Sequence, residues 1–219
     1  MNDKNPNLDA VLVPEEARGR LLDAAEKLFC EKGFHATSVR ELTTEANCNI
    51  AAVNYHFGGK ENLYREMFRR QFEMMIQGNL DIVGQVMNGP GPTVESLTRA
   101  IVEPAIRRIA KNEANSQVLR MLVREVLNNQ VDPEYVVKDL KERLFDRLGE
   151  ALKQLVPNLP DDKANMTLVV CSFDGVILHP FLFYEMYQKM IPGLTVEQLV
   201  DHMVKFVASA IRGYSTSVK

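Results

Sequence analysis

Apolar residues recur at intervals of three and four positions along most of this 219-residue sequence. That spacing lines up one face of an α-helix. The alternating Val, Ile or Thr positions and the hairpin dipeptides that mark β-strands are absent. The pattern therefore predicts an all-α fold.

The first predicted helix covers residues 14–32. Pro14, followed by two glutamates, is a favourable helix start, and Gly33 stands where a left-handed C-cap belongs. One apolar stripe runs along this helix and predicts its buried face: Ala17, Leu21, Leu22, Ala25, Leu28 and Phe29.

A helix-turn-helix pattern follows. Ser38 and Glu41 form a capping box for a short helix that ends near residue 46. Asn47 can adopt the left-handed backbone conformation of a tight turn, and Asn49 can cap a third short helix. The spacing directs these side chains of the two helices inward: Val39, Leu42, Ala46, Ile50, Val53 and Phe57. Two short helices across a three-residue turn are typical of a helix-turn-helix.

The remaining sequence predicts longer helices separated by Gly, Pro and Asn. Gly58-Gly59 ends the third helix, and a fourth is expected over residues 60–87, before a loop at 88–92. Pro104 and Pro180 fall inside helical patterns and should kink or split those helices. Further helices are expected over residues 93–111, 115–129, 133–155, 161–190 and 195–213.

The charge balance argues against a broadly basic DNA-binding surface. The chain carries 26 Lys and Arg residues against 29 Asp and Glu residues, a net charge of −3. Residues 1–60 alone contain seven basic and nine acidic side chains. Because nucleic-acid-binding domains are often strongly basic, any DNA contact here must come from individually placed groups.

One segment carries a specific motif. Residues 19–64 read GRLLDAAEKLFCEKGFHATSVRELTTEANCNIAAVNYHFGGKENLY, in which Tyr55-His56-Phe57 is followed by Lys60-Glu61 and Leu63. Over this segment the chain resembles the TetR family of transcriptional regulators. Three features are similar to the CecR-like branch of that family: the NYHF string that begins at Asn54, the pair Arg124-Glu125, and the long helix expected from Pro133 to Val156.

The resemblance implies an all-α protein of about nine helices, whose last two long helices form a four-helix bundle with those of a second copy across a two-fold axis. It implies a flexible tail over residues 1–13, a helix-turn-helix DNA-binding domain over 14–60, and a ligand-binding and dimerisation domain over 61–219. It also implies a repressor that binds double-stranded operator DNA as a homodimer and releases it when a small molecule binds. The sequence departs from the family at Asn47, where Gly is usual, and at Asn54, where an aromatic residue is usual.

The third helix carries small, neutral side chains suited to the major groove, and Asn54 offers an amide that can pair with adenine. Hydroxyl, imidazole and ammonium groups around this helix can bind phosphates. We expect the following residues at the DNA surface: Thr37, Ser38, Arg40, Asn49, Ile50, Ala51, Ala52, Asn54, Tyr55, His56 and Lys60.

The C-terminal part contains candidates for an effector site and a dimer interface. Aromatic, polar and methionine side chains predict contacts to a partly apolar small molecule: Met121, Arg124, Phe173, His179, Phe183 and Tyr187. An alternative for His179 is a kink in a packed helix, since Pro180 follows it. We assign dimerisation to the last two long helices, over 165–190 and 195–213, where small residues favour close approach: Ser172, Gly175, Ala208, Ser209 and Ala210.

Other classes of protein are disfavoured. The sequence contains no GxSxG, P-loop or HExxH motif, so no enzyme, cofactor or metal site is indicated. Three cysteines without a CxxC pair favour a reducing cytoplasm. Asp174, His179 and Pro180 interrupt the apolar stretch 166–184, which favours a buried helix over a membrane span. The remaining alternative is a helical protein-interaction or ligand-carrier module, whose binding would respond little to salt.

Overall fold

A computed structural model of the chain describes residues 14–111, 121, 123 and 140–217. All regular secondary structure in these ranges is helical, as the apolar spacing predicts. The chain divides into two compact units, residues 1–72 and residues 73–219, which we call the N-terminal unit and the C-terminal unit.

The N-terminal unit contains α1 (Pro14–Lys32), α2 (Val39–Glu45), α3 (Ala51–Phe57) and the first turns of α4 (Lys60–Met87). The apolar stripe predicted for the first helix lies in the core of this unit, joined by side chains from the other three helices. The largest fully buried side chains of the unit are Leu21, Phe29, Leu42, Val53, Leu63, Met67 and Phe68. Each short helix contributes only one or two such side chains, so α2 and α3 depend on α1 and α4 for their burial.

The predicted helix ends are confirmed. Gly33 has a φ of 80° and its N–H donates to Phe29 O, as a left-handed C-cap requires. The Ser38 hydroxyl accepts the Glu41 N–H while the Glu41 carboxylate accepts the Ser38 N–H, which completes the capping box. Asn47 has a φ of 50°, the left-handed conformation predicted for the turn.

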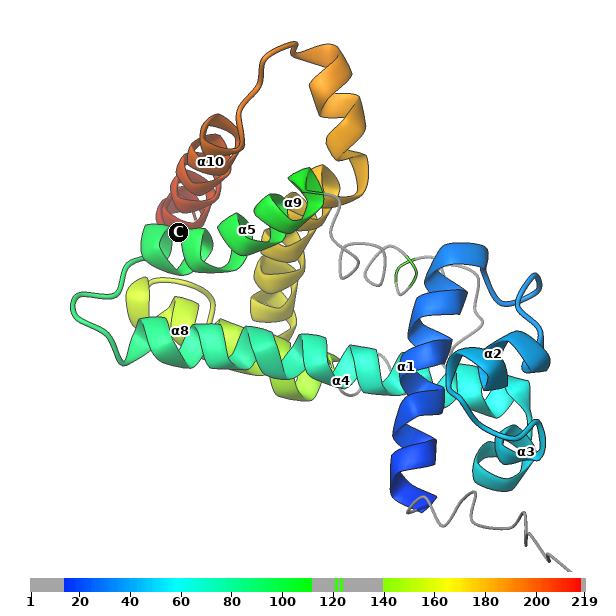
Figure 1. The fold of residues 1–219 in the computed structure, drawn as a ribbon. Helices are drawn as coiled ribbons and strands as arrows, with labels where there is room; N and C mark the ends of the chain where they lie inside the picture. The colour runs from blue at the N-terminus through cyan, green and yellow to red at the C-terminus, as the bar shows by residue number, and fades with distance from the viewer. Residues whose placement is uncertain (1–13, 112–120, 122, 124–139, 218–219) are drawn as a thin grey trace, which may run out of the picture. The chain divides into compact units, whose positions relative to one another are not determined.

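The helix α4 is continuous across the division between the two units, which falls between Phe72 and Glu73 (Figure 1). We expected the DNA-binding domain to end at residue 60. The compact unit reaches further because Leu63, Met67 and Phe68 complete its core. The first turns of α4 are therefore part of the N-terminal unit.

The C-terminal unit contains α5 (Val94–Ala110), the π-helix η1 (Leu140–Phe145), α8 (Asp146–Leu155), α9 (Lys163–Met190) and α10 (Val196–Ser217). It has two hydrophobic clusters. One includes Leu97, Leu152, Val170, Phe173 and Val207, and the other includes Val102, Ile106, Phe181, Val200 and Met203. Of the predicted helix over 115–129 the structure describes only Met121 and Val123, both helical, and the described part of the one over 133–155 forms η1 and α8.

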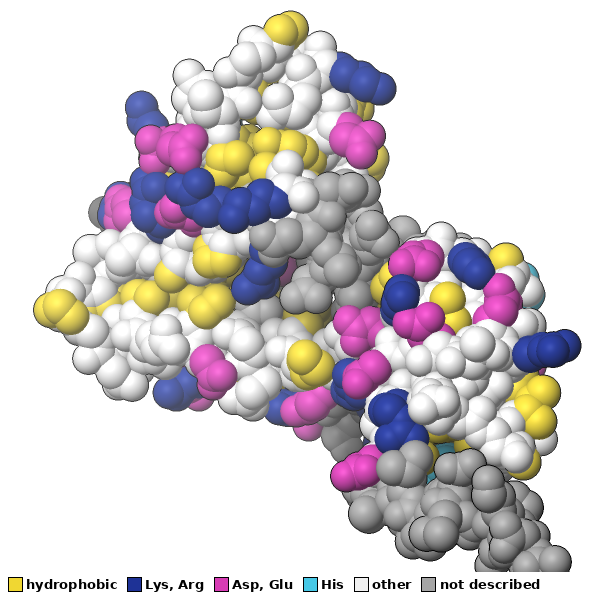
Figure 2. All heavy atoms as spheres, in the orientation of Figure 1, with side chains coloured by type: hydrophobic (Ala, Val, Ile, Leu, Met, Phe, Trp, Pro, Cys, Tyr) yellow, Lys and Arg dark blue, Asp and Glu magenta, His cyan; other side chains and the backbone are white. Residues whose placement is uncertain are grey.

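The helix α10 packs mainly on α5. Three ion pairs join these two helices, and Figure 2 shows a mixed band of basic and acidic side chains on the visible face of the unit. The pairs are Arg99–Asp201 at 2.5 Å, Arg107–Glu197 at 3.0 Å and Arg212–Glu95 at 2.5 Å. Because all three pairs are largely exposed, each adds about 0–1 kcal/mol and the apolar clusters dominate the packing.

The two internal prolines behave differently. Pro180 bends α9, since Phe183 in the next turn has non-helical angles (φ −115°, ψ 24°), and the bend is visible in Figure 1. Pro104 lies inside α5, which is assigned as one helix throughout. The expected kink or split is therefore confirmed at Pro180, whereas Pro104 does not divide its helix.

Within the described ranges, α9 is the one helix that is long and apolar enough to cross a bilayer. Several of its apolar side chains instead belong to the two core clusters, namely Val169, Val170, Phe173 and Phe181. Packing against α5, α8 and α10 buries 28% of its most apolar stretch, whereas side chains such as Leu168 and Met190 are exposed.

Candidate nucleic-acid interface and effector site

The turn between α2 and α3 is held by a residue on α1. The Arg20 side chain donates from Nε to Ala46 O at 2.9 Å and from Nη2 to Cys48 Sγ at 3.6 Å. Ala46 is the C-cap of α2, so the guanidinium satisfies a carbonyl at the end of that helix. This role of Arg20 was not predicted from the sequence. The one local feature that could have indicated it is the position of Arg20 beside the apolar stripe of α1.

The start of α2 corrects one predicted DNA contact. Thr37 is only 1% exposed, and its hydroxyl donates to Leu28 O and Gly33 O, so the expected phosphate contact by this side chain is wrong. Ser38 is exposed, but its hydroxyl and N–H are both engaged with Glu41. These two residues join α1 to α2, and a buried threonine hydroxyl needs such partners.

Glu41 is held as a carboxylate by its neighbours. The Lys32 ammonium, 2.7 Å away, and the N–H and hydroxyl of Ser38 lower the pKa of Glu41 to about 2. Its negative charge therefore persists throughout the neutral range and is matched by Lys32 on α1.

The outer face of α3 presents small and neutral side chains. Ile50 is 57% exposed and Tyr55 is 78% exposed. Because Ile50 lies at the surface, the inward position deduced for it from spacing is wrong, and the position implied by the family resemblance is the one observed. Val53 and Phe57 are buried as predicted.

The remaining predicted residues of α3 lie on or beside this face. Ala51 and Asn54 are exposed, and Ala52 and His56 are half-buried. The His56 ring packs edge-on against Tyr55, with ring centroids 4.8 Å apart. The N-cap position of α3 is Ile50 and not the predicted Asn49, although Asn49 Oδ1 accepts the Ala51 N–H at 2.9 Å.

Ion pairs place a cation beside many carboxylates of the N-terminal unit. Five acidic side chains of this unit pair with lysines or arginines, and Figure 2 shows acidic and basic side chains interspersed on the visible face of the unit. The pairs are Arg18–Glu66, Lys27–Glu45, Lys32–Glu41, Arg70–Asp23 and Arg70–Glu26. These pairs do not change the net charge, but each of the five carboxylates has a cation beside it, which reduces the local repulsion of a phosphate.

Two cations predicted at the DNA surface, Arg40 for a base edge or a phosphate and Lys60 for a phosphate, have no acidic partner in the described part of the chain. Arg40 is exposed near the start of α2. The Lys60 ammonium lies over the Phe34 ring at 4.2 Å, a cation–π contact that orients it without neutralising its charge.

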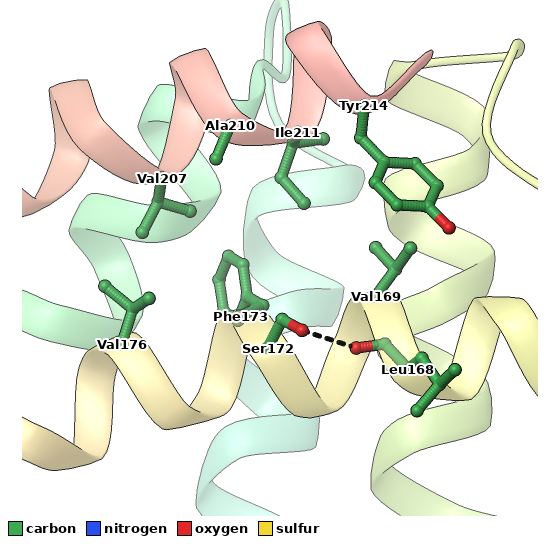
Figure 3. A pocket seen from close by; sticks show the side chains of 9 residues that line it. All are labelled: Leu168, Val169, Ser172, Phe173, Val176, Val207, Ala210, Ile211 and Tyr214. Atoms are coloured by element: carbon green, nitrogen blue, oxygen red, sulfur yellow. Dashed lines mark hydrogen bonds between the residues drawn. The ribbon is translucent and has the colours of Figure 1, made fainter. Parts of the chain in front are cut away.

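The C-terminal unit contains an apolar pocket between α9 and α10, with a volume of about 380 Å³ (Figure 3). Its lining comprises Leu168, Val169, Ser172, Phe173, Val176, Val207, Ala210, Ile211 and Tyr214. The lining has two polar side-chain groups, the hydroxyls of Ser172 and Tyr214. The Ser172 hydroxyl donates to Leu168 O. This volume and composition lie within the range of small-molecule sites.

The predicted effector residues do not form a single site. Phe173 lines the apolar pocket, whereas His179, Phe183 and Tyr187 form a separate aromatic cluster on α9. In that cluster His179 Nδ1 lies 3.2 Å from the Tyr187 hydroxyl, and its ring is 4.8 Å from that of Phe183. Met121 is buried, and Arg124 lies outside the described residues.

The small residues predicted to favour dimerisation differ in their exposure. Ser172, Gly175, Ser209 and Ala210 are exposed, whereas Ala208 is 1% exposed and belongs to the hydrophobic core. Ala208 therefore favours close packing within the chain and not against a partner.

Comparison with known proteins agrees with this geometry. The family described as bacterial regulatory proteins of the tetR family matches residues 21–67, which span most of α1, all of α2 and α3, and the start of α4. The chain is 32% identical to the HTH-type transcriptional dual regulator CecR of Shigella flexneri over 175 residues, which cover 74% of this chain and 73% of that protein.

Two solved structures have a similar fold along most of the chain. A TetR-like transcriptional regulator from Rhodococcus sp. RHA1 has a TM-score of 0.59 at 18% identity and covers 90% of this chain and 96% of its own. The transcriptional regulator FadR from Bacillus subtilis, solved with stearoyl-CoA, has a TM-score of 0.65 at 13% identity and covers 87% and 97%. At these identities the likeness concerns the fold.

Proposed function

This chain belongs to the TetR family of bacterial transcriptional regulators, and from that premise we propose that it is a repressor that a small molecule releases from a palindromic operator. The observation that carries the proposal is the exposed, neutral face of α3, held by the Arg20 contact to Ala46 O. A helix of this kind fits the major groove, where uncharged side chains reach base edges.

Base reading is assigned to the outer face of α3. Asn54 is exposed, and its amide can donate to and accept from an adenine. Ile50, Ala51 and Ala52 present apolar groups that can contact thymine methyl groups. Asn49 contributes mainly through the hydrogen bond that its Oδ1 accepts from the Ala51 N–H.

Phosphate binding is assigned to residues around that face. Arg40 and Lys60 supply positive charge, and Tyr55 and His56 supply a hydroxyl and an imidazole. Ser38 remains exposed, although Glu41 occupies its hydroxyl and N–H. These contacts position the protein without requiring a basic domain.

Selection of random duplex DNA by the full-length protein, at two salt concentrations, tests the proposal. We expect an enriched palindrome whose half-sites are centred about 34–36 Å apart, with binding that weakens steeply as salt rises. Asn54→Ala should relax the preference at one position of each half-site, a loss of about 1–3 kcal/mol of discrimination. Asn88→Ala, which removes an exposed asparagine from the C-terminal unit, serves as the matched control.

Two results would contradict this assignment. An Asn54→Ala selection with unchanged specificity would remove Asn54 from base reading. If the protein does not bind duplex DNA, or binds it equally well at both salt concentrations, the repressor assignment is wrong and a helical protein-interaction or carrier module is favoured.

Homodimerisation through α9 and α10 is the second part of the proposal. Outside the apolar pocket and the aromatic cluster, large apolar side chains are exposed on both helices: Met186, Met190 and Phe206. Exposed apolar surface of this extent marks an interaction site, and two copies related by a two-fold axis would place two α3 helices on successive major grooves. We assign the protein to the cytoplasm, where it would meet operator DNA.

The effector assignment rests on the apolar pocket. FadR, a structural neighbour, binds stearoyl-CoA, and an acyl chain suits the lining of the pocket around Phe173. We propose an effector with an aliphatic chain, the Tyr214 hydroxyl serving as the polar contact. The aromatic cluster of His179, Phe183 and Tyr187 is proposed as a further contact.

Displacement of the selected operator by acyl-CoA thioesters of increasing chain length tests this site. Each added methylene should tighten binding about fourfold until the pocket is full, since burial of one CH₂ is worth about 0.8 kcal/mol. Val176→Phe should weaken displacement because the larger side chain occupies the pocket, with operator affinity and dimer mass as controls. If acyl-CoA thioesters displace the operator equally well from the wild-type protein and from the variant, the effector binds outside the apolar pocket.

A further inference from the structure

A second hollow lies wholly within the N-terminal unit. It has a volume of about 290 Å³, and we call it the polar pocket. Its lining comes from α1, the end of α3 and the first turns of α4: Arg18, His56, Phe57, Asn62, Arg65 and Glu66. Only His56 among these residues belongs to the predicted DNA surface. The other polar groups have no role in the function proposed above.

The pocket carries excess positive charge. The Glu66 carboxylate, the one acid in its lining, is 2.8 Å from Arg18 and 2.9 Å from Arg69. Arg65 is exposed, and no acidic side chain of the described residues forms an ion pair with it. The lining thus carries two guanidinium groups, of Arg18 and Arg65, and a single carboxylate, which is paired with Arg18 and with Arg69. An anion that enters the pocket meets a positive field and an unneutralised Arg65.

Two donors of the pocket, Arg18 and His56, are held in place by their neighbours. The Arg18 guanidinium lies over the Phe57 ring at 5.2 Å and is anchored at its other end by Glu66. The Asn62 amide nitrogen lies beside the turn at Gly58, 3.4 Å from the place that a Cβ on this glycine would take. His56 is packed against Tyr55. Donors fixed in this way lose little conformational entropy when they bind a ligand.

We propose that the polar pocket binds a phosphodiester group of the operator backbone, with Arg65 as the principal ligand and Asn62 and Arg18 as supporting donors. Guanidinium groups recognise phosphate through paired, charge-assisted hydrogen bonds. The pocket adjoins the predicted DNA surface through His56, so the strand that contacts Tyr55 and His56 can reach it. The inference rests on the proposed function and adds to it a phosphate clamp formed by the first turns of α4.

The test compares Arg65→Met with wild type on the selected operator over a range of salt concentrations. We expect a loss of about tenfold in affinity for all duplexes alike and a fall of about one in the slope of log K against log salt. Arg65→Lys should keep the slope, since it keeps the charge. Arg108→Met, which removes an exposed arginine from α5 in the other unit, should change neither quantity.

Titration with inorganic phosphate, monitored by NMR signals of the arginine side chains and of His56, distinguishes the source of the anion. Millimolar binding that Arg65→Met abolishes, together with the reduced DNA slope, supports the clamp. Tight phosphate binding with an unchanged DNA slope would overturn it in favour of a free phosphate ligand, and an unchanged slope without phosphate binding would overturn it outright. Failure of the wild-type protein to bind duplex DNA would instead refute the proposed function, so the two failures are distinguishable.

Discussion

Phe29→Ala is expected to unfold the N-terminal unit and leave the C-terminal unit folded. Phe29 is fully buried, and its ring packs edge-on against Tyr64 at 5.0 Å and beside Phe34 at 5.8 Å. Removing a buried phenyl ring costs about 3–5 kcal/mol, a large share of the roughly 5–15 kcal/mol that stabilises a whole domain. The C-terminal unit has its own hydrophobic clusters.

Amide hydrogen exchange followed residue by residue measures this outcome. Protection should vanish from α1 to α3 and persist in α5 and α10, and DNA binding should be lost. Phe34→Ala is the matched control, because the Phe34 ring is only half-buried and its removal should cost less. A uniform loss of protection across both units would show that they unfold as one body and would contradict the prediction.

Phe206→Glu should convert the proposed dimer into a monomer and reduce operator affinity about a thousandfold. Phe206 is 54% exposed on α10, in the face assigned to the partner. Loss of one interface anchor costs about 2 kcal/mol or more of binding free energy. A two-fold dimer contains two copies of each substitution, so the loss is about 4 kcal/mol, which corresponds to about a thousandfold in affinity. The introduced carboxylate would also be buried without a partner charge.

Sedimentation equilibrium and operator titration measure the two effects separately. Met74→Glu is the matched control, since Met74 is an equally exposed apolar residue on α4 and outside the proposed interface. We expect the control to remain dimeric and to bind DNA as wild type does. An unchanged mass for Phe206→Glu would exclude this residue from the interface and require another face for dimerisation.

Local chemistry made the helix-turn-helix predictable. The bounds of α1, the capping box of Ser38 and Glu41, and the left-handed Asn47 all follow from residues that are neighbours in sequence. Caps, turns and apolar periodicity depend on residues a few positions apart, so they can be predicted from the sequence. The Tyr55-His56-Phe57 motif then identified the family, which the comparisons confirm.

The effector site was less predictable. The sequence grouped Phe173 with His179, Phe183 and Tyr187 because all lie on one helix, but Phe173 lines the apolar pocket while the others cluster on the surface of α9. A pocket is made of surfaces from different helices. Its lining depends on how α9 and α10 diverge, and periodicity along one helix does not report that angle.

The sequence by itself determined the helices, their caps, the helix-turn-helix and the family of this protein, because those features depend on short-range patterns. Tertiary structure alone decided that Thr37 is buried, that Arg20 satisfies Ala46 O, and that Arg65 and Arg18 meet in one pocket. These contacts join residues far apart in the chain. Burial, ion pairing and pocket lining are properties of the packed helices, and no local pattern encodes them.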